Sequence, residues 1–478
     1  MTVFFLCVVL LVLGYMTYAK VVDRIFGPDD ERKTVAIAAP DGVDTIAMPT
    51  WKVFFIQLLD IAGIGPIFGP ILGVLYGPWA LVWIVIGTIF AGGVHDYFSG
   101  MLSVRYGGGS LPEVIGEIMG RPARAVLRIF SVLLLVLVGV VFVLSPAKLL
   151  TALTGVDTLL LVGAIFVYYF FATILPIDKL IGRLYPFLGF LLLFMTVGVL
   201  GGLLFSDYAV LPDLAFRANP HPKGVAIWPM LFITLSCGAI SGFHSTQSPI
   251  MARCIRSEKS GRKVFYGAMV AEGIIALVWA TVGMSFYESP AALQAVIAEG
   301  SPALVVNQAC RGLLGPIGAV VAILGVIVLP ITSGDTAFRS TRLILAETFK
   351  VSQVKPLRRL FIAVPLFLVA IGISTQEFDI IWRYFGWSNQ TLAALVLWAS
   401  AIYLMKAGKP HWIASLPATF MTAVVCAFIL QADIGFRLPA LVANVAGLVA
   451  AAFALGGLLW AGVRILPETK GEVTVDTK

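Results

Sequence analysis

Two acidic residues lie within apolar sequence that is long enough to cross a bilayer. Asp60 is about nine residues into the segment 52–76, and Glu272 lies at a similar depth in the segment 263–287. A carboxylate at that depth is costly, so such residues commonly have a function. We interpret Asp60 as a proton acceptor or cation ligand; the alternative is a hydrogen-bonded carboxyl that holds unwound backbone. Glu272 is equally consistent with a proton site and with a buried hydrogen bond to a broken helix.

Asp60 opens a run of glycine and proline, DIAGIGPIFGP (60–70), that interrupts a regular membrane helix. Pro66 and Pro70 each remove a backbone donor, and Gly63 and Gly65 allow the chain to unwind. In this first break (63–70) the freed carbonyls can coordinate a cation, and the exposed helix N-terminus can hold an anionic group. We therefore predict substrate contacts at Gly63, Gly65 and Gly69. The alternative is a kinked helix that packs through glycines spaced four apart, namely Gly69, Gly73 and Gly77.

A second interrupted segment, LFITLSCGAISGFHSTQSP (231–249), carries small polar residues where an apolar run is expected. Its second break (238–244) begins at Gly238 and contains Ser241, Gly242 and His244, which we predict to contact substrate. A histidine near its reference pKa of about 6.5 is a natural proton switch. The alternative for His244 is a purely structural hydrogen bond.

The segment PITSGDTAFR (330–339) places two hydroxyls, Thr332 and Ser333, directly before Asp335. Hard cations prefer oxygen ligands, so these three residues are candidates for binding a coupling ion. The alternative for Asp335 is a local ion pair with Arg339, which is four residues further along the same helix.

Two further pairs of polar residues lie in apolar segments. His95 and Asp96 are adjacent on a predicted helix, where neighbouring residues do not face one another, so we predict a structural or gating role and not a dyad. Asn389 and Gln390 are amides at the middle of segment 381–404. They either hydrogen-bond a substrate carboxylate or hold helices together.

The elements that must position these residues are membrane helices. Of the 478 residues, 59% are hydrophobic and only 12% are charged, which is about half the charge of a soluble chain. We predict an all-α polytopic membrane protein with thirteen spans. The spans are 3–22, 52–76, 79–102, 123–148, 157–175, 184–206, 227–246, 263–287, 316–346, 357–375, 381–404, 411–431 and 437–462, and the loop 288–315 has room for a short surface helix.

The two breaks lie five spans apart, so spans 2–6 and 7–11 form two halves of five helices each. An odd number of helices makes the halves inverted, and a broken first helix in each half indicates a secondary transporter. The predicted domain covers 1–478. It has an N-terminal helix and cytoplasmic loop (1–51), a first repeat (52–206), a second repeat (227–404) and accessory helices (411–462).

The basic residues predict the orientation of the spans. With the N-terminus outside and the C-terminus in the cytoplasm, 27 of the 33 lysines and arginines fall on the cytoplasmic side. This asymmetry supports the orientation. The external side holds Lys148, Arg217, Lys223, Arg311, Arg383 and Arg437.

Several function classes find no support in the sequence. The basic residues mark topology and do not indicate a nucleic-acid surface. The five scattered cysteines predict neither a disulfide nor a metal site, and the four histidines, far apart in sequence, form no evident catalytic set. We therefore expect a protein that is not an enzyme and has no cofactor beyond a coupling ion. An ion channel and a nutrient sensor on a transporter scaffold remain alternatives.

Six ordered motifs resemble the carbon starvation protein A (CstA) family of bacterial transporters: DGVDTIAMPT, IAGIGPIFGPILG, GGVHDYFSGMLSVR, PMLFITLSCGAISGFHS, TSGDTAFRSTR and FGWSNQTLAAL. The resemblance implies a fold of the LeuT type, with five plus five inverted helices. It also implies a Na⁺ site in which Thr332 and Ser333 meet carbonyls of the first broken helix. The chain departs from the family pattern at Ile56 and Gln57, where a histidine pair is usual, and at Asp60, where alanine is common.

The resemblance also implies uptake of peptides or pyruvate. We therefore predict a bacterial inner-membrane symporter that imports a small carboxylate-bearing nutrient, a short peptide or pyruvate, with H⁺ or Na⁺. Asp60, Thr332 and Ser333 would carry the coupling, and the two breaks would bind the substrate. The expected partners are the lipid bilayer and the substrate, with no nucleic acid.

Overall fold

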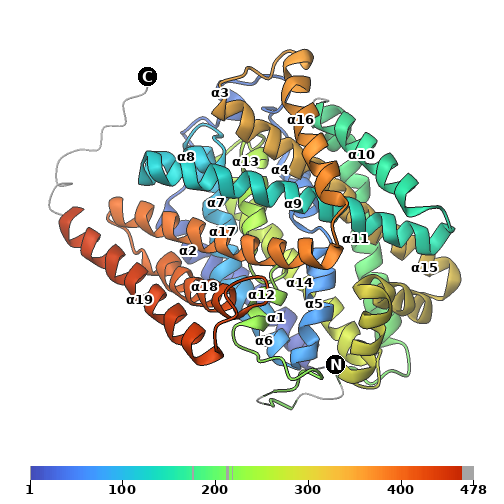
Figure 1. The fold of residues 1–478 in the computed structure, drawn as a ribbon. Helices are drawn as coiled ribbons and strands as arrows, with labels where there is room; N and C mark the ends of the chain where they lie inside the picture. The colour runs from blue at the N-terminus through green and yellow to red at the C-terminus, as the bar shows by residue number, and fades with distance from the viewer. Residues whose placement is uncertain (1, 175–176, 212–214, 218, 466–478) are drawn as a thin grey trace.

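The computed structural model describes residues 2–174, 177–211, 215–217 and 219–465 (Figure 1). All regular structure in these residues is helical. The first half of the chain contains α1 (Thr2–Met16), α2 (Tyr18–Phe26), α3 (Val35–Ala38), α4 (Thr50–Ile61), α5 (Gly65–Gly73), η1 (Val74–Tyr76), α6 (Trp79–Gly87), η2 (Thr88–Gly92), α7 (Gly93–Arg105), α8 (Leu111–Met119), α9 (Arg121–Thr154), α10 (Thr158–Ile174) and α11 (Ile177–Leu204).

The second half has the same all-helical character. It contains α12 (Met230–Thr234), α13 (Gly242–Ala252), η3 (Glu258–Ser260), η4 (Arg262–Tyr266), α14 (Gly267–Ser285), α15 (Pro290–Thr348), α16 (Pro356–Ser374), α17 (Phe378–Lys406), α18 (Trp412–Gln431) and α19 (Ala440–Ile465). The predicted loop 288–315 is instead helical. Non-helical backbone at Gly300, Ser301 and Gly315 divides α15 into successive helical pieces. The piece between Ser301 and Gly315 packs on the bundle through buried apolar residues such as Val305 and Ala309.

The helical stretches agree with the predicted membrane spans in part. In the described residues, eight are long and apolar enough to cross a membrane, and the bent pair formed by α4 and α5 with η1 raises the number to nine. The predicted spans 157–175 and 184–206 correspond to shorter apolar helices, 227–246 to the divided pair α12 and α13, and 381–404 to part of α17. The count of thirteen spans therefore stays a prediction.

The helices that carry the candidate residues lie inside the bundle. Every residue of α13 is buried, as is every residue of α7 before Arg105. By contrast, only 22% of the apolar window of α19 and 33% of that of α16 are buried, and these helices lie at the edges in Figure 1. Their exposed faces carry large apolar side chains such as Phe361, Phe453 and Trp460, which suit contact with lipid.

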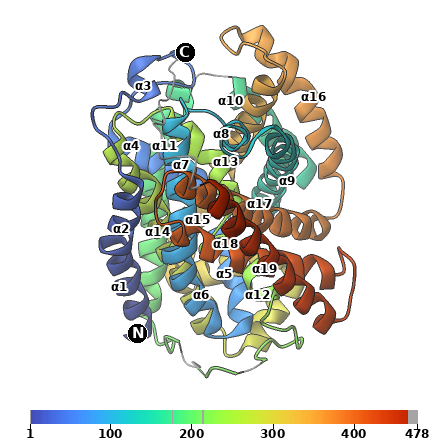
Figure 2. The ribbon, with the colours of Figure 1, turned by 90° about the vertical axis from the view of Figure 1, so that its left-hand side faces the viewer.

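The predicted cytoplasmic and external loops lie at opposite ends of the bundle. Figure 2 places α3 and the start of α16 at one end, while α1 begins near the opposite end. The short helices α3 and α8 belong to loops that the basic residues predict to be cytoplasmic. We refer to their end of the bundle as the inner end and to the opposite end as the outer end.

Candidate substrate and ion site

The first break is shorter than the sequence predicted. Helix α4 ends at Ile61 and α5 begins at Gly65, with a bend of 49° between them. The first unwound segment is therefore 62–64, and most of the predicted range 63–70 is helical. The physical reason is that Pro66 lies in the first turn of α5, where its missing N–H has no helical partner to lose. Gly63 lies in the unwound segment, and Gly65 and Gly69 lie in α5.

The second break extends further toward the N-terminus than predicted. Helix α12 ends at Thr234 and α13 begins at Gly242, so the second unwound segment is 235–241. Gly238 has a φ of +87°, which residues with a side chain rarely adopt. Ser241 lies at the N-cap of α13, and His244 lies in its first turn and not in unwound backbone. The predicted range 238–244 thus covers the end of the unwound segment and the start of α13.

The two broken helices pack directly on one another. A Cβ atom added to Gly65 would lie 2.3 Å from Cys237 Cβ, and one added to Gly69 would lie 3.4 Å from the Thr234 carbonyl oxygen. The absence of side chains at these glycines therefore allows α5 to approach the second unwound segment. The chain is unwound at 62–64 and closely packed along α5, so unwinding and close packing occur together. Substrate contact at Gly63, Gly65 and Gly69 stays a prediction.

Amides from α17 satisfy the backbone of the second unwound segment. Asn389 Oδ1 accepts from the Phe243 backbone N–H at 2.6 Å, and its amide nitrogen donates to Ser241 Oγ at 3.0 Å. Gln390 Nε2 donates to the Ile240 carbonyl at 3.0 Å. These contacts match the predicted alternative in which the two amides hold helices together. A contact with substrate stays a prediction for both.

A hydroxyl from α15 reaches the first broken helix. Ser333 Oγ donates to the Leu59 carbonyl at 2.9 Å, whereas Thr332 Oγ1 donates within its own helix to Leu329 at 2.8 Å. Asp60 and Asp335 are both fully buried and close enough for their charges to interact. In the described part of the chain, neither carboxylate oxygen of Asp60 has a hydrogen-bond partner. The structure thus brings Ser333, Asp60 and Asp335 together beside the first unwound segment.

A second group of titratable side chains lies at the start of α13. His244 Nδ1 lies 2.9 Å from Asp96 Oδ2, and His244 Nε2 lies 3.3 Å from Glu272 Oε2. Asp96 Oδ1 in turn lies 2.8 Å from His95 Nδ1. All four side chains are fully buried. Glu272 therefore lies with His244.

The prediction that His95 and Asp96 form no dyad is wrong. Side chains of successive residues leave a helix in different directions. The His95 side chain is nevertheless long enough for its ring to turn back and contact the Asp96 carboxylate. Asp96 is also the residue that links α7 to α13.

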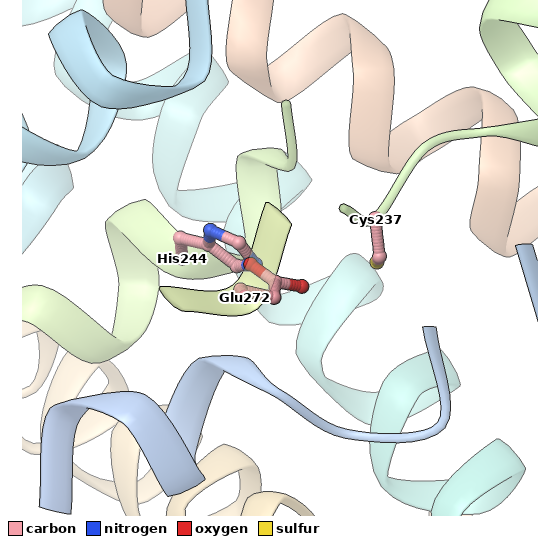
Figure 3. A group of neighbouring side chains, drawn as sticks. All are labelled: Cys237, His244 and Glu272. Atoms are coloured by element: carbon pink, nitrogen blue, oxygen red, sulfur yellow. The ribbon is translucent and has the colours of Figure 1, made fainter. Parts of the chain in front are cut away.

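Sequence reasoning also missed the position of Cys237. Its Sγ, a ring nitrogen of His244 and a carboxylate oxygen of Glu272 all lie within 4.8 Å of one another (Figure 3). The cysteine spacing gave no sign of this, because the three residues come from the unwound segment, α13 and α14. The only available signal was a cysteine and a histidine seven residues apart across a break.

A cavity of about 490 Å³ leads from the outer end toward the second unwound segment. Thr234 and Ser236 line it, together with the basic side chains of Lys223 and Arg383 and the ring of His221. Asp433 also lines the cavity, 3.9 Å from Arg383. Burial and the nearby Lys223 lower the pKa of His221, so the ring is neutral at pH 7.

Buried ion pairs lie at the inner end. Asp44 Oδ1 accepts from Arg339 at 2.9 Å, and Asp44 Oδ2 accepts from Arg342 at 3.3 Å. Burial alone would raise the pKa of the Asp44 carboxyl, but the two arginines outweigh this and hold that pKa below its usual range. Nearby, between α8, α13 and α15, a hollow lined by Ser340 and Arg253 measures only about 10 Å³.

Comparison with known proteins places this fold. Residues 1–162, 144–300 and 282–427 match the family described as carbon starvation protein CstA. An uncharacterized membrane protein of Haemophilus influenzae is 46% identical over 62% of this chain and 94% of its own length. The peptide transporter CstA of Escherichia coli is 23% identical over 89% of this chain and 80% of its own length.

One further sequence relative and one solved structure extend the comparison. The pyruvate/proton symporter BtsT of Escherichia coli is 26% identical over 58% of this chain and 48% of its own length. Among solved structures, a mutant of the manganese transporter of Eremococcus coleocola has a TM-score of 0.59 and 14% identity, covering 89% of this chain and 99% of the other. That similarity shows a shared fold. This multi-pass membrane protein therefore belongs to the carbon starvation protein CstA family.

Proposed function

We propose that this chain is a secondary active symporter that imports a small carboxylate-bearing nutrient, a short peptide or pyruvate, together with H⁺ or Na⁺. One arrangement carries the proposal: two broken membrane helices pack together, and a cavity of about 490 Å³ reaches the second of them at Thr234 and Ser236. Interrupted helices of this kind form the binding sites of many secondary transporters. The peptide transporter and the pyruvate/proton symporter among the relatives support the choice of substrates.

The cavity favours a substrate with a carboxylate. Lys223 and Arg383 carry two positive charges against the single negative charge of Asp433. A net positive vestibule attracts an anion and raises its local concentration. We propose that the substrate passes Thr234 and Ser236 and binds at the second unwound segment, near Ser241 and Gly242, against the helix that carries Gly65 and Gly69.

The coupling ion is proposed to bind beside the first unwound segment. Asp60 and Asp335 are two buried carboxyl groups whose charges repel each other, so a proton or a Na⁺ ion between them would relieve the repulsion. Ser333 lies at the same place, because its hydroxyl contacts the Leu59 carbonyl next to Asp60. Binding of the cation would thus alter the end of α4, which connects directly to the break.

Alternating access is proposed to follow from movement of the two broken helices. In this proposal residues 52–206 and 227–404 are inverted repeats of five helices, with α4–α5 and α12–α13 as the first helix of each. The cavity at the outer end and the ion pairs of Asp44 with Arg339 and Arg342 at the inner end support the proposal that this conformation is an outward-facing state. The membrane would be the bacterial inner membrane, with the N-terminus outside and the C-terminus in the cytoplasm.

Uptake into proteoliposomes tests the proposal. The purified full chain would be reconstituted, and labelled pyruvate and a labelled dipeptide would be offered separately under an imposed pH gradient or Na⁺ gradient. We expect one substrate to accumulate under one gradient, and accumulation to be absent from empty liposomes. A current without substrate would instead indicate a channel, and binding without accumulation would indicate a sensor. Either result, in folded protein, would refute symport.

A further inference from the structure

We propose that Cys237, His244 and Glu272 bind a divalent transition-metal ion of the Zn²⁺ type in the second broken helix. This site goes beyond the symport proposal and does not depend on it. The three side chains are buried and come from the second unwound segment, α13 and α14. Figure 3 shows a carboxylate oxygen of Glu272 beside the His244 ring and directed toward Cys237.

The distances are close to those of a metal site. Ligands at about 2.0–2.3 Å from a tetrahedral Zn²⁺ lie about 3.3–3.6 Å from one another. His244 Nε2 and Glu272 Oε2 are already 3.3 Å apart, and the sulfur completes a group within 4.8 Å. Cys237 lies on unwound backbone, so a small movement would bring its sulfur into range. The Cys237 thiol donates to Ser241 Oγ at 3.5 Å, a long contact that a metal–sulfur bond would replace. In the described residues, His244 Nε2 and both Glu272 oxygens have no hydrogen-bond partner.

Asp96 orients the histidine as a metal ligand. Its Oδ2 lies 2.9 Å from His244 Nδ1. In the neutral tautomer with its proton on Nδ1, the ring donates to this carboxylate and its Nε2 lone pair is available to a metal ion on the side of Glu272. Metal-bound histidines commonly hold their other nitrogen in this way, because the carboxylate fixes the ring and raises its basicity. His95, 2.8 Å from Asp96 Oδ1, fixes the carboxylate in turn.

The charges and ligand types select a divalent transition metal. The Cys237 thiolate and the Glu272 carboxylate carry two negative charges, which a divalent ion would offset, and an uncompensated charge is costly in this buried place. The further negative charge of Asp96 is held by its contacts with His244 and His95. A sulfur ligand favours Zn²⁺ and similar ions over Na⁺, Mg²⁺ or Ca²⁺, which prefer oxygen. Asn389 Nδ2 lies 3.9 Å from Cys237 Sγ and would stabilise the thiolate.

The outer cavity lies close to the site. Its lining includes Ser236, which directly precedes Cys237 in the chain. Three protein ligands leave a fourth position for water or for an oxygen from a bound molecule.

Cobalt provides a direct test on the purified full chain in detergent. The reduced protein would be stripped with a chelator and titrated with Co²⁺, whose visible bands report tetrahedral coordination and whose near-ultraviolet charge-transfer band reports a thiolate ligand. We expect both signals to saturate at one ion per chain and to disappear when Zn²⁺, which has no such bands, displaces Co²⁺.

Matched variants locate the ion. Cys237→Ser should lose the charge-transfer band, whereas Cys310→Ser, a change at a buried cysteine outside the cluster, should keep it. Asp96→Asn should keep the band but bind Co²⁺ about 10–100-fold more weakly. The melting temperature of each variant without metal would show that it is folded. The absence of a Co²⁺ spectrum in folded wild-type protein, or a band unchanged by Cys237→Ser, would overturn the proposal whatever the uptake assay shows.

Discussion

Replacing Asp44 by asparagine tests how the inner end is held closed. Asp44 is 2% exposed and Arg339 and Arg342 are fully buried, so the two guanidinium groups share one buried carboxylate. Removing one partner of a buried ion pair costs about 3–5 kcal/mol, because charge is left uncompensated. Asparagine retains an oxygen that accepts from Arg339, so we expect a loss near the lower value. About 3 kcal/mol corresponds to a change of more than about a hundredfold in the unfolding equilibrium.

The expected pH dependence follows from the lowered pKa of Asp44. The pKa in the folded protein lies below the value of about 3.9 for an unfolded chain, since the arginines outweigh burial. The stabilisation is therefore complete above the unfolded value and is lost only as pH falls through the folded value. The stability difference between wild type and Asp44→Asn should thus stay constant from about pH 5.5 to about pH 8.

Denaturation by SDS from mixed micelles would measure the stability difference. Asp30→Asn is the matched control, because Asp30 pairs with Lys259 in the same loop region but is exposed to solvent, and it should leave stability unchanged. In a double-mutant cycle, adding Arg342→Met to Asp44→Asn should recover part of the loss, since one uncompensated charge is removed.

Access from the inner end provides a second readout. Ser340 lines the small hollow between α8, α13 and α15. The cysteine of a Ser340→Cys variant should react faster with a maleimide when Asp44→Asn is also present than in the otherwise wild-type chain. The reasoning would be refuted if Asp44→Asn and Asp30→Asn had the same stability in SDS denaturation and the rate of maleimide labelling at position 340 did not change.

Three further predictions concern the outer cavity and the two breaks. Asp60→Asn should abolish concentrative uptake while the protein stays folded and inserted; full uptake by this variant would exclude Asp60 as the coupling residue. Asn389→Leu should reduce stability by about 1–3 kcal/mol in SDS denaturation, since the Phe243 N–H would be left buried without an acceptor. His221 is neutral at pH 7, so acidification through its lowered pKa adds positive charge to the cavity. The KM for a carboxylate substrate should therefore fall on acidification by a larger factor in wild type than in His221→Gln, and equal pH profiles would contradict this role.

The sequence predicted features whose cause is local. Gly63 and Gly65, with Pro66 beside them, favour an interruption of a helix in an apolar run, so the first break could be located to within a few residues. Its length was overestimated, because a proline in the first turn of a helix does not prevent that helix from starting. The family resemblance predicted that Thr332 and Ser333 contact carbonyls of the first broken helix. Ser333 does so at the Leu59 carbonyl, whereas the Thr332 hydroxyl donates to Leu329 in its own helix.

Charged groups were harder to place. Arg339 lies four residues after Asp335, which predicts a pair within one helix. Arg339 also donates to Asp44, 295 positions away, because the loop before α4 folds back over the inner end of α15. The helical repeat of the sequence predicts which residues are neighbours on one helix. It does not predict contacts with a loop from another part of the chain.

The side chains that hydrogen-bond to the unwound backbone of a break come from other helices. The backbone of the second unwound segment is satisfied by Asn389 and Gln390, about 150 positions away along the chain. Likewise, Asp96 is 148 positions from His244, and Cys237 meets Glu272 only because α14 packs beside the unwound segment. The effect of a glycine or proline on its own backbone can be predicted from the residue type. A buried carbonyl, amide or carboxylate needs a hydrogen-bond or ionic partner, but its residue type does not identify that partner. The position of a break can thus be read from one segment, while its ligand chemistry requires the packing of at least three.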